Sequence, residues 1–146
     1  MKDNFKLKVN IKMQLFDCNG DLKTTRRLHN TKTNASIYGL LDQLLNTPTL
    51  AKVGWMELGT GTPTDTLLGS YIVGSRKIIS KIRTLNILTI VCTFIAGVGT
   101  GNITEIGLFD TATENTINMW ASGTDFTVIS KTATDVLVVT WSLILN

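Results

Sequence analysis

Histidine is nearly absent from this sequence, in which His29 is the only one. A Ser-His-Asp triad would have to use this residue, but its sequence neighbours offer nothing to orient the ring. The two cysteines, Cys18 and Cys92, lie far apart, so no cluster has the spacing of a zinc site. The sequence also lacks two carboxylates at short sequence separation that could serve as a general acid and a general base. We therefore expect no metal, no cofactor and no catalytic centre, and an exposed structural role for His29.

Charged residues are also scarce, at 17% of the chain beside 43% hydrophobic residues. A typical soluble domain has about 25% charged residues. Either another molecule covers part of the surface, or the chain is an ordinary sandwich with a threonine-rich surface. We expect the protein to be made in a cytoplasm, because two cysteines fit a reducing compartment and lysines interrupt any N-terminal signal sequence. The longest apolar run, 87–98, contains Thr89 and Thr93 and is too short to span a bilayer.

The few charges are unevenly distributed along the chain. Residues 1–32 hold eight basic and three acidic residues, whereas the remainder holds six basic and eight acidic residues. This asymmetry would allow the N-terminal region of one subunit to complement the body of its neighbour. Nucleic-acid binding is the sharper alternative, but the lysines alternate with apolar residues and lack interleaved aromatics. We favour a solvated strand face and expect no nucleic-acid partner.

What the sequence has in abundance is strand pattern. Apolar and polar residues alternate from Phe5 to Leu15, which predicts a half-buried strand. Asn19-Gly20 then predicts a tight hairpin turn into a more polar strand over 22–28. Further strands are expected over 53–58, 76–84, 87–96, 103–109, 117–121, 126–130 and 136–145, with a hairpin turn near Leu85-Asn86.

One helix is expected among these strands, over residues 34–46. Asn34 can cap its start, leucines recur at three and four residues, and Pro48 ends it. The pattern as a whole predicts a mainly β protein, an antiparallel β-sandwich or jelly-roll-like fold in one domain over 1–146. The single helix would cover an open end or face of a sheet.

Two of the predicted strands, 87–96 and 136–145, are apolar on both faces. A sheet with one solvated face does not need this, so either the helix or another subunit covers the second face. Trp141 lies within the last strand and is expected in the core, while the environments of Trp55 and Trp120 stay open.

Glu105 is an isolated charge within the apolar segment Ile-Thr-Glu-Ile-Gly-Leu-Phe. If it is buried it needs a partner, for which Arg76, Arg83 and Lys131 are the candidates. Gly107 then predicts a close backbone approach or a bulge. The glycine-rich segments 59–62 and 97–101 lack the features of phosphate-binding loops, so we expect turns whose glycines adopt positive φ.

Several motifs follow one another along the chain: Gly59-Thr-Gly-Thr-Pro-Thr-Asp-Thr-Leu67, Arg76 at the start of a strand, the strand 87–94, and Glu105-Ile-Gly-Leu-Phe109. With the closing segments 126–131 and 138–143, this series resembles a group of small virion proteins of tailed bacteriophages. The resemblance covers roughly residues 53–146. Members of this group are β-rich and often trimeric. The resemblance therefore implies either a head-decoration protein or a tail-associated module, and it brings no catalytic residues with it.

The function implied by this resemblance is a virion structural protein, made in the host cytoplasm, that decorates and stabilises the capsid by binding other proteins. The alternative is a tail adaptor or a fibre module involved in attachment. The partners would be the major capsid protein or tail proteins, together with further copies of this chain in a homotrimer. The hairpin over 5–28 would act as an inter-subunit arm. The candidate structural and interaction residues are Arg76, Glu105, Gly107, Lys131 and Trp141.

Overall fold

The computed structural model describes residues 7–29 and 51–146, and all regular elements in these ranges are β-strands. The strands are β1 (Leu7–Phe16), β2 (Leu22–His29), β3 (Trp55–Gly59), β4 (Lys77–Ile78), β5 (Ser80–Thr84), β6 (Ile87–Phe94), β7 (Gly101–Ile103), β8 (Glu105–Phe109), β9 (Met119–Gly123), β10 (Ile129–Lys131) and β11 (Val136–Leu145). The helix expected over 34–46 lies outside the described residues. None of the described segments forms a helix that could cross a membrane.

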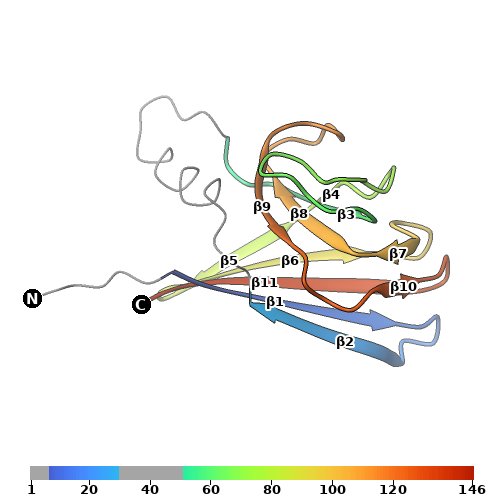
Figure 1. Cartoon of the computed structure of the whole chain (residues 1–146). Coiled ribbons are helices and arrows are strands. Elements are labelled where there is room, and N and C mark those ends of the chain that lie inside the picture. The colour runs from blue at the N-terminus through green and yellow to red at the C-terminus, as the bar shows by residue number, and fades with distance from the viewer. Residues whose placement is uncertain (1–6, 30–50) are drawn as a thin grey trace, which may run out of the picture.

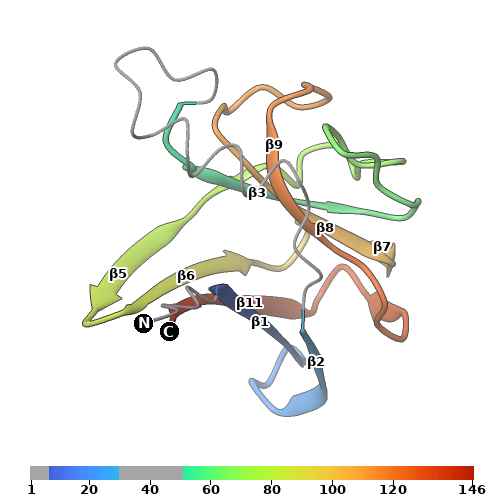
Figure 2. The same cartoon turned by 60° about the vertical axis from the view of Figure 1, so that its left-hand side comes forward.

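The strands form two main antiparallel sheets, stacked face to face (Figures 1 and 2). The five-stranded sheet has the order β2-β1-β11-β6-β5, and the four-stranded sheet has the order β4-β3-β8-β9. A short pair, β10-β7, lies at one end. The predicted antiparallel β-sandwich is therefore confirmed.

The core lies between the two sheets because alternate residues of each strand point inward. In β1 the buried residues alternate with more exposed ones, as the sequence predicted. The five-stranded sheet contributes side chains such as Ile11, Met13, Ile90, Phe94 and Trp141. The four-stranded sheet contributes Met56, Leu58, Ile106 and Leu108. Burial of these side chains is the main favourable contribution to folding.

Two predicted strands are interrupted where the chain passes from one sheet to another. The expected strand 76–84 divides into β4 in the four-stranded sheet and β5 in the five-stranded sheet, with buried Ile79 between them. The expected strand 103–109 divides in the same way into β7 and β8, around Thr104. The apolar pattern runs through both crossings, because a residue between two packed sheets is as buried as one inside a strand.

Both predicted hairpin turns are confirmed. Gly20 has φ 87° and follows the Asp17–Asn19 turn that joins β1 to β2. The β5–β6 hairpin turns at Leu85 and Asn86, because Thr84 pairs with Ile87.

Candidate functional site

The far side of the four-stranded sheet, opposite the core, carries polar and charged residues under a covering loop. Cross-strand pairing sets Glu57 beside Gly107 and Gly59 beside Glu105, so these residues share one face. Residues 60–76 fold over that face, and Leu68 and Tyr71 pack against Trp55, Phe109 and Met119. A second, smaller apolar cluster therefore lies outside the main core.

Glu105 holds this covering loop by its backbone. The side chain is fully buried, and its Oε1 accepts hydrogen bonds from the amides of Gly61 and Ser70, both at 2.9 Å. Its Oε2 accepts a third, from Gly69 at 3.0 Å. The expected ion pair with Arg76, Arg83 or Lys131 was wrong, because three backbone donors satisfy the carboxylate instead.

Arg76 pairs with Glu57, a residue that the sequence analysis did not single out. Arg76 Nη2 lies 2.8 Å from Glu57 Oε2, and both side chains are 1% exposed. The guanidinium also stacks over the Phe109 ring, 3.5 Å from its centroid, and donates to the Thr111 carbonyl at 2.8 Å. Burial raises the pKa of Glu57, while the hydrogen bond and charge of Arg76 oppose that shift. The pair is a buried salt bridge that fixes the position of Arg76, at the end of the covering loop, against β3.

The glycines of this region allow close packing. A Cβ on Gly59 would overlap the Glu105 carboxylate, and one on Gly61 would lie 2.7 Å from the Ser70 amide nitrogen. The expectation of positive φ was wrong for this segment but confirmed for Gly97, Gly99 and Gly101. At Gly107 a Cβ would lie 2.7 Å from the Phe109 ring. Side chains, rather than the expected backbone, approach Gly107, and the bulge lies one residue later, between Leu108 and Phe109.

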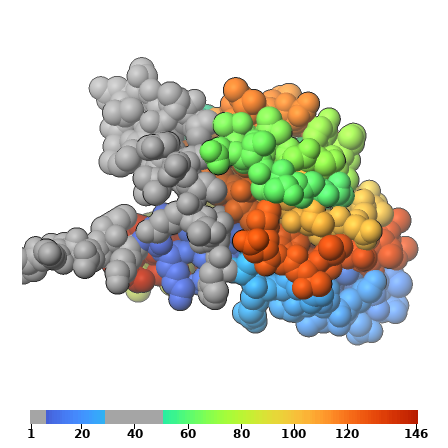
Figure 3. Space-filling view, in the orientation of Figure 1, coloured from blue at the N-terminus to red at the C-terminus, as the bar shows by residue number. Residues whose placement is uncertain are grey.

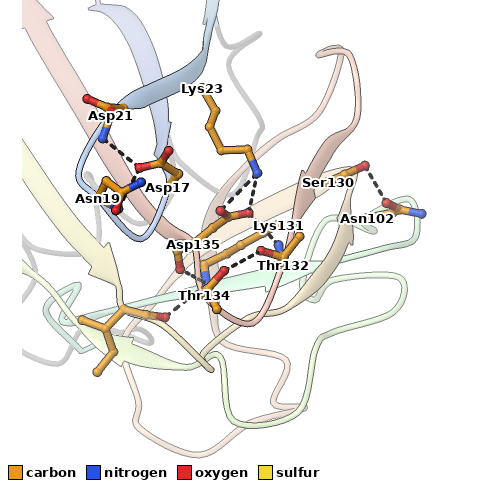
Figure 4. Close-up of polar contacts among 11 residues, drawn as sticks. Asp17, Asn19, Asp21, Lys23, Asn102, Ser130, Lys131, Thr132, Thr134 and Asp135 are labelled. Atoms are coloured by element: carbon orange, nitrogen blue, oxygen red, sulfur yellow. Dashed lines mark hydrogen bonds and ion pairs between the residues drawn. The ribbon is translucent and has the colours of Figure 1, made fainter.

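Lys131 belongs to a separate polar cluster near the start of β11, drawn in Figure 4. Its ammonium group is buried and donates to the carbonyls of Ile95 at 3.1 Å and Asp135 at 2.7 Å. Desolvation lowers the Lys131 pKa. The Asp135 carboxylate accepts from the Thr132 amide at 2.8 Å and from Lys23 at 3.0 Å, which together hold its pKa at about 2. This cluster ties β2 to the turn before β11.

The tryptophans are structural. Trp141 is fully buried in the core, as expected. Trp55 packs partly buried in the smaller cluster, and the Trp120 indole donates to the Ala51 carbonyl at 3.0 Å.

No cluster of three His, Cys, Asp or Glu residues that could hold a metal occurs within 7–29 and 51–146. The two cysteines are free, and burial raises the pKa of the Cys92 thiol to about 12, which makes it a poor nucleophile. His29 ends β2, and its side chain is outside the described part of the structure.

The clearest candidate for an interaction is the outer face of the five-stranded sheet, the side turned away from the four-stranded sheet. Cross-strand pairing assigns residues to this face from all five strands. On β11, β6 and β5 they are mostly β-branched: Val136, Val138, Thr140, Ile144, Ile87, Thr89, Val91, Thr93, Ile82 and Thr84. Among the apolar residues of this face, Ile82 is exposed, at 65%, whereas the valines and isoleucines of β6 and β11 are partly buried.

The β1 and β2 side of the same face is basic. Lys12 pairs across the strands with Arg27, and Lys8 lies two alternate positions along β1 from Lys12, beyond Asn10. Within residues 7–29 and 51–146, the side chains of these three basic residues make no hydrogen bond or ion pair. By contrast Arg26, on the other face of β2, donates to the Thr127 carbonyl at 3.3 Å. In Figure 3 the light-blue surface of β2 accordingly lies beside the orange-red segment before β10.

Sequence periodicity identified the lysines of β1 and the two-sided apolar strands, but it did not join them into one face. Strand pairing was the missing information. Comparison with known proteins adds no further identification, since no family model, no curated protein and no solved structure matches this chain.

Proposed function

We propose that this protein is a structural component of a tailed-bacteriophage particle, which decorates the head and stabilises it by binding other virion proteins. The outer face of the five-stranded sheet is its main binding surface. The sandwich fold and the motif resemblance over residues 53–146 support the proposal. The outer face carries it, because Lys8, Lys12 and Arg27, which have no partner among the described residues, lie there beside β-branched side chains that are exposed or only partly buried.

This face suits a protein partner with an acidic rim and an apolar centre. Exposed threonine, valine and isoleucine on a sheet form a flat surface that can be desolvated at modest cost, since their side chains have little rotamer freedom. Lys8, Lys12 and Arg27 would steer an acidic surface into register. The proposal includes no chemical reaction, because the buried acids and Lys131 are engaged in structural contacts.

The decisive experiment is to count copies of the protein in purified virions by quantitative mass spectrometry against the major capsid protein. A head-decoration role predicts hundreds of copies per particle, because such proteins follow the capsid lattice. A handful of copies would contradict decoration and support the tail adaptor or fibre module. Complete absence from the particle would overturn both virion roles.

The binding surface can be tested separately with the double substitution Lys8→Glu/Lys12→Glu. Binding to capsids that lack the protein should weaken about tenfold, which corresponds to about 1.4 kcal/mol. The matched control, Lys52→Glu/Lys77→Glu, makes the same charge change away from the outer face and should bind normally. Equal effects of both variants would show a nonspecific dependence on net charge and contradict the assignment of this face.

A further inference from the structure

The β5 strand is the free edge of the five-stranded sheet. Among the strands that the structure describes, β6 is its only neighbour, and all five of its residues are exposed. In an antiparallel pair, alternate residues direct their backbone N–H and C=O groups away from the neighbouring strand. The outer side of β5 therefore presents donors and acceptors that an additional strand can pair with.

The side chains of β5 separate by charge between its two faces. Ser80, Ile82 and Thr84 share the outer face with Val91, Thr89 and Ile87 of β6. Lys81 and Arg83 lie on the opposite face, next to Ile90 and Leu88. The Lys81 ammonium donates to the Val53 carbonyl and Arg83 donates to the Leu85 carbonyl at 3.0 Å. No carboxylate neutralises either cation within the described ranges.

This charge pattern disfavours a second copy of β5 as the added strand. An antiparallel β5–β5 pair that keeps like faces together can be centred on residue 81, 82 or 83. The three registers set Lys81 opposite Lys81, Lys81 opposite Arg83, or Arg83 opposite Arg83. Like charges directly opposite one another destabilise a strand pair, so every register is penalised.

We propose that β5 is a docking edge for an extended segment of another protein that carries two acidic residues at alternate positions with an apolar residue between them. The two acids would lie opposite Lys81 and Arg83, and the apolar residue would cover Ile82. Backbone pairing would supply affinity, and the charges would select the partner. This inference goes beyond the virion function, and it does not involve the cations of the outer face.

The test uses two short capped peptides, acetyl-Thr-Glu-Val-Glu-Thr-amide and its counterpart with lysine in place of both glutamates. Titration of the ¹⁵N-labelled protein should move the amide signals of residues 79–85 on addition of the acidic peptide. We expect the acidic peptide to bind about tenfold more tightly than the basic one, because two opposite-charge pairs replace two like-charge pairs.

The double substitution Lys81→Glu/Arg83→Glu should reverse this preference, so that the basic peptide binds more tightly. The Lys8→Glu/Lys12→Glu variant makes the same charge change on the outer face and should keep the preference for the acidic peptide. Absence of shifts with either peptide would mean that Lys81 and Arg83 only protect the edge, and would overturn the proposal. Concentration-dependent shifts at 79–85 without peptide would also overturn it, because they would identify a second copy as the occupant. Neither result would affect the capsid-binding test.

Discussion

Glu57, Glu105 and Lys131 are each at most 2% exposed, and each contacts a different kind of partner. Glu57 binds a guanidinium, Glu105 binds backbone amides, and Lys131 binds backbone carbonyls. A buried charge without a partner is strongly unfavourable, so each of these residues specifies the conformation of the segment that it contacts. For Glu105 that segment is the loop over 60–76, and for Lys131 it is the turn before β11.

The substitution Glu105→Gln should destabilise the protein by about 1–3 kcal/mol, because the amide nitrogen of glutamine cannot accept a backbone hydrogen bond. One of the amides of Gly61, Gly69 and Ser70 then loses its acceptor within the protein. Urea unfolding measures the loss. Asp65→Asn removes an exposed carboxylate from the same loop and should change stability by less than about 0.5 kcal/mol. Equal stability of Glu105→Gln and the parent protein would contradict the role assigned to Glu105.

Asp135 predicts a specific acid dependence. Its pKa is lowered from 3.8 to about 2 by the Thr132 amide and Lys23. A depressed carboxyl pKa contributes stability above the unfolded-state value, and that contribution is lost as pH falls through the folded-state value. We expect the free energy of unfolding to fall less between pH 5 and pH 2 in Asp135→Asn than in the parent protein. Parallel pH profiles for the two proteins would show that Asp135 is not held in this way.

At the scale of elements, the strands were largely predictable and their interruptions were not. Alternation is a local signal, so β1, β6 and β11 follow directly from their residues. The division into β4 and β5 depends on which sheet each half joins. An apolar residue at position 79 fits a continuous strand as well as a crossing between sheets, so the sequence does not reveal the division. Glu105 accepts hydrogen bonds from backbone amides, which every residue except proline has, so no residue type in the sequence marks these donors. Charge alone therefore suggested arginine or lysine as its partner. Arg76 was a candidate partner of Glu105, but it binds Glu57, which lies in a strand that is buried on both faces.

The loop between β6 and β7 offers a matched pair of glycine substitutions. Gly97 and Gly99 both have positive φ, of 77° and 64°. A Cβ on Gly97 meets nothing within 4 Å, whereas one on Gly99 lies 2.5 Å from Leu58 Cδ1. Gly97→Ala should cost about 1 kcal/mol from backbone strain alone. Gly99→Ala should cost a further 1–3 kcal/mol, approximately, because it also overpacks the core. Thermal unfolding compares the two, and equal losses would exclude the steric contribution at Gly99.

For the whole molecule, the separation of charge and apolar surface bears on assembly. The cations of the outer face lie on β1 and β2, and most of its apolar residues, of which Ile82 is exposed, lie on β5, β6 and β11. A face divided in this way can contact two different neighbours at once. A closed ring of identical subunits is the simplest arrangement that uses both halves.

The family resemblance predicts a homotrimer in solution. Light scattering coupled to size-exclusion chromatography should then give three times the 16.0 kDa chain mass. If the basic half of the outer face contributes to the interface, the trimer should dissociate as salt is raised, since exposed charge pairs are screened. A monomer mass at low salt and high concentration would contradict the trimer.

The pairing of β1 with β11 has a consequence for when the sheet can form. Leu7 lies opposite Leu145, and β11 separates β1 from β6 within the sheet. During synthesis the β1–β2 hairpin and the β5–β6 hairpin are complete early, but each lacks its neighbour until β11 leaves the ribosome. A strand that follows both hairpins in the chain is therefore the one that joins them. Until β11 is available both hairpins lack a partner at one edge, so the nascent chain is vulnerable to aggregation up to that point.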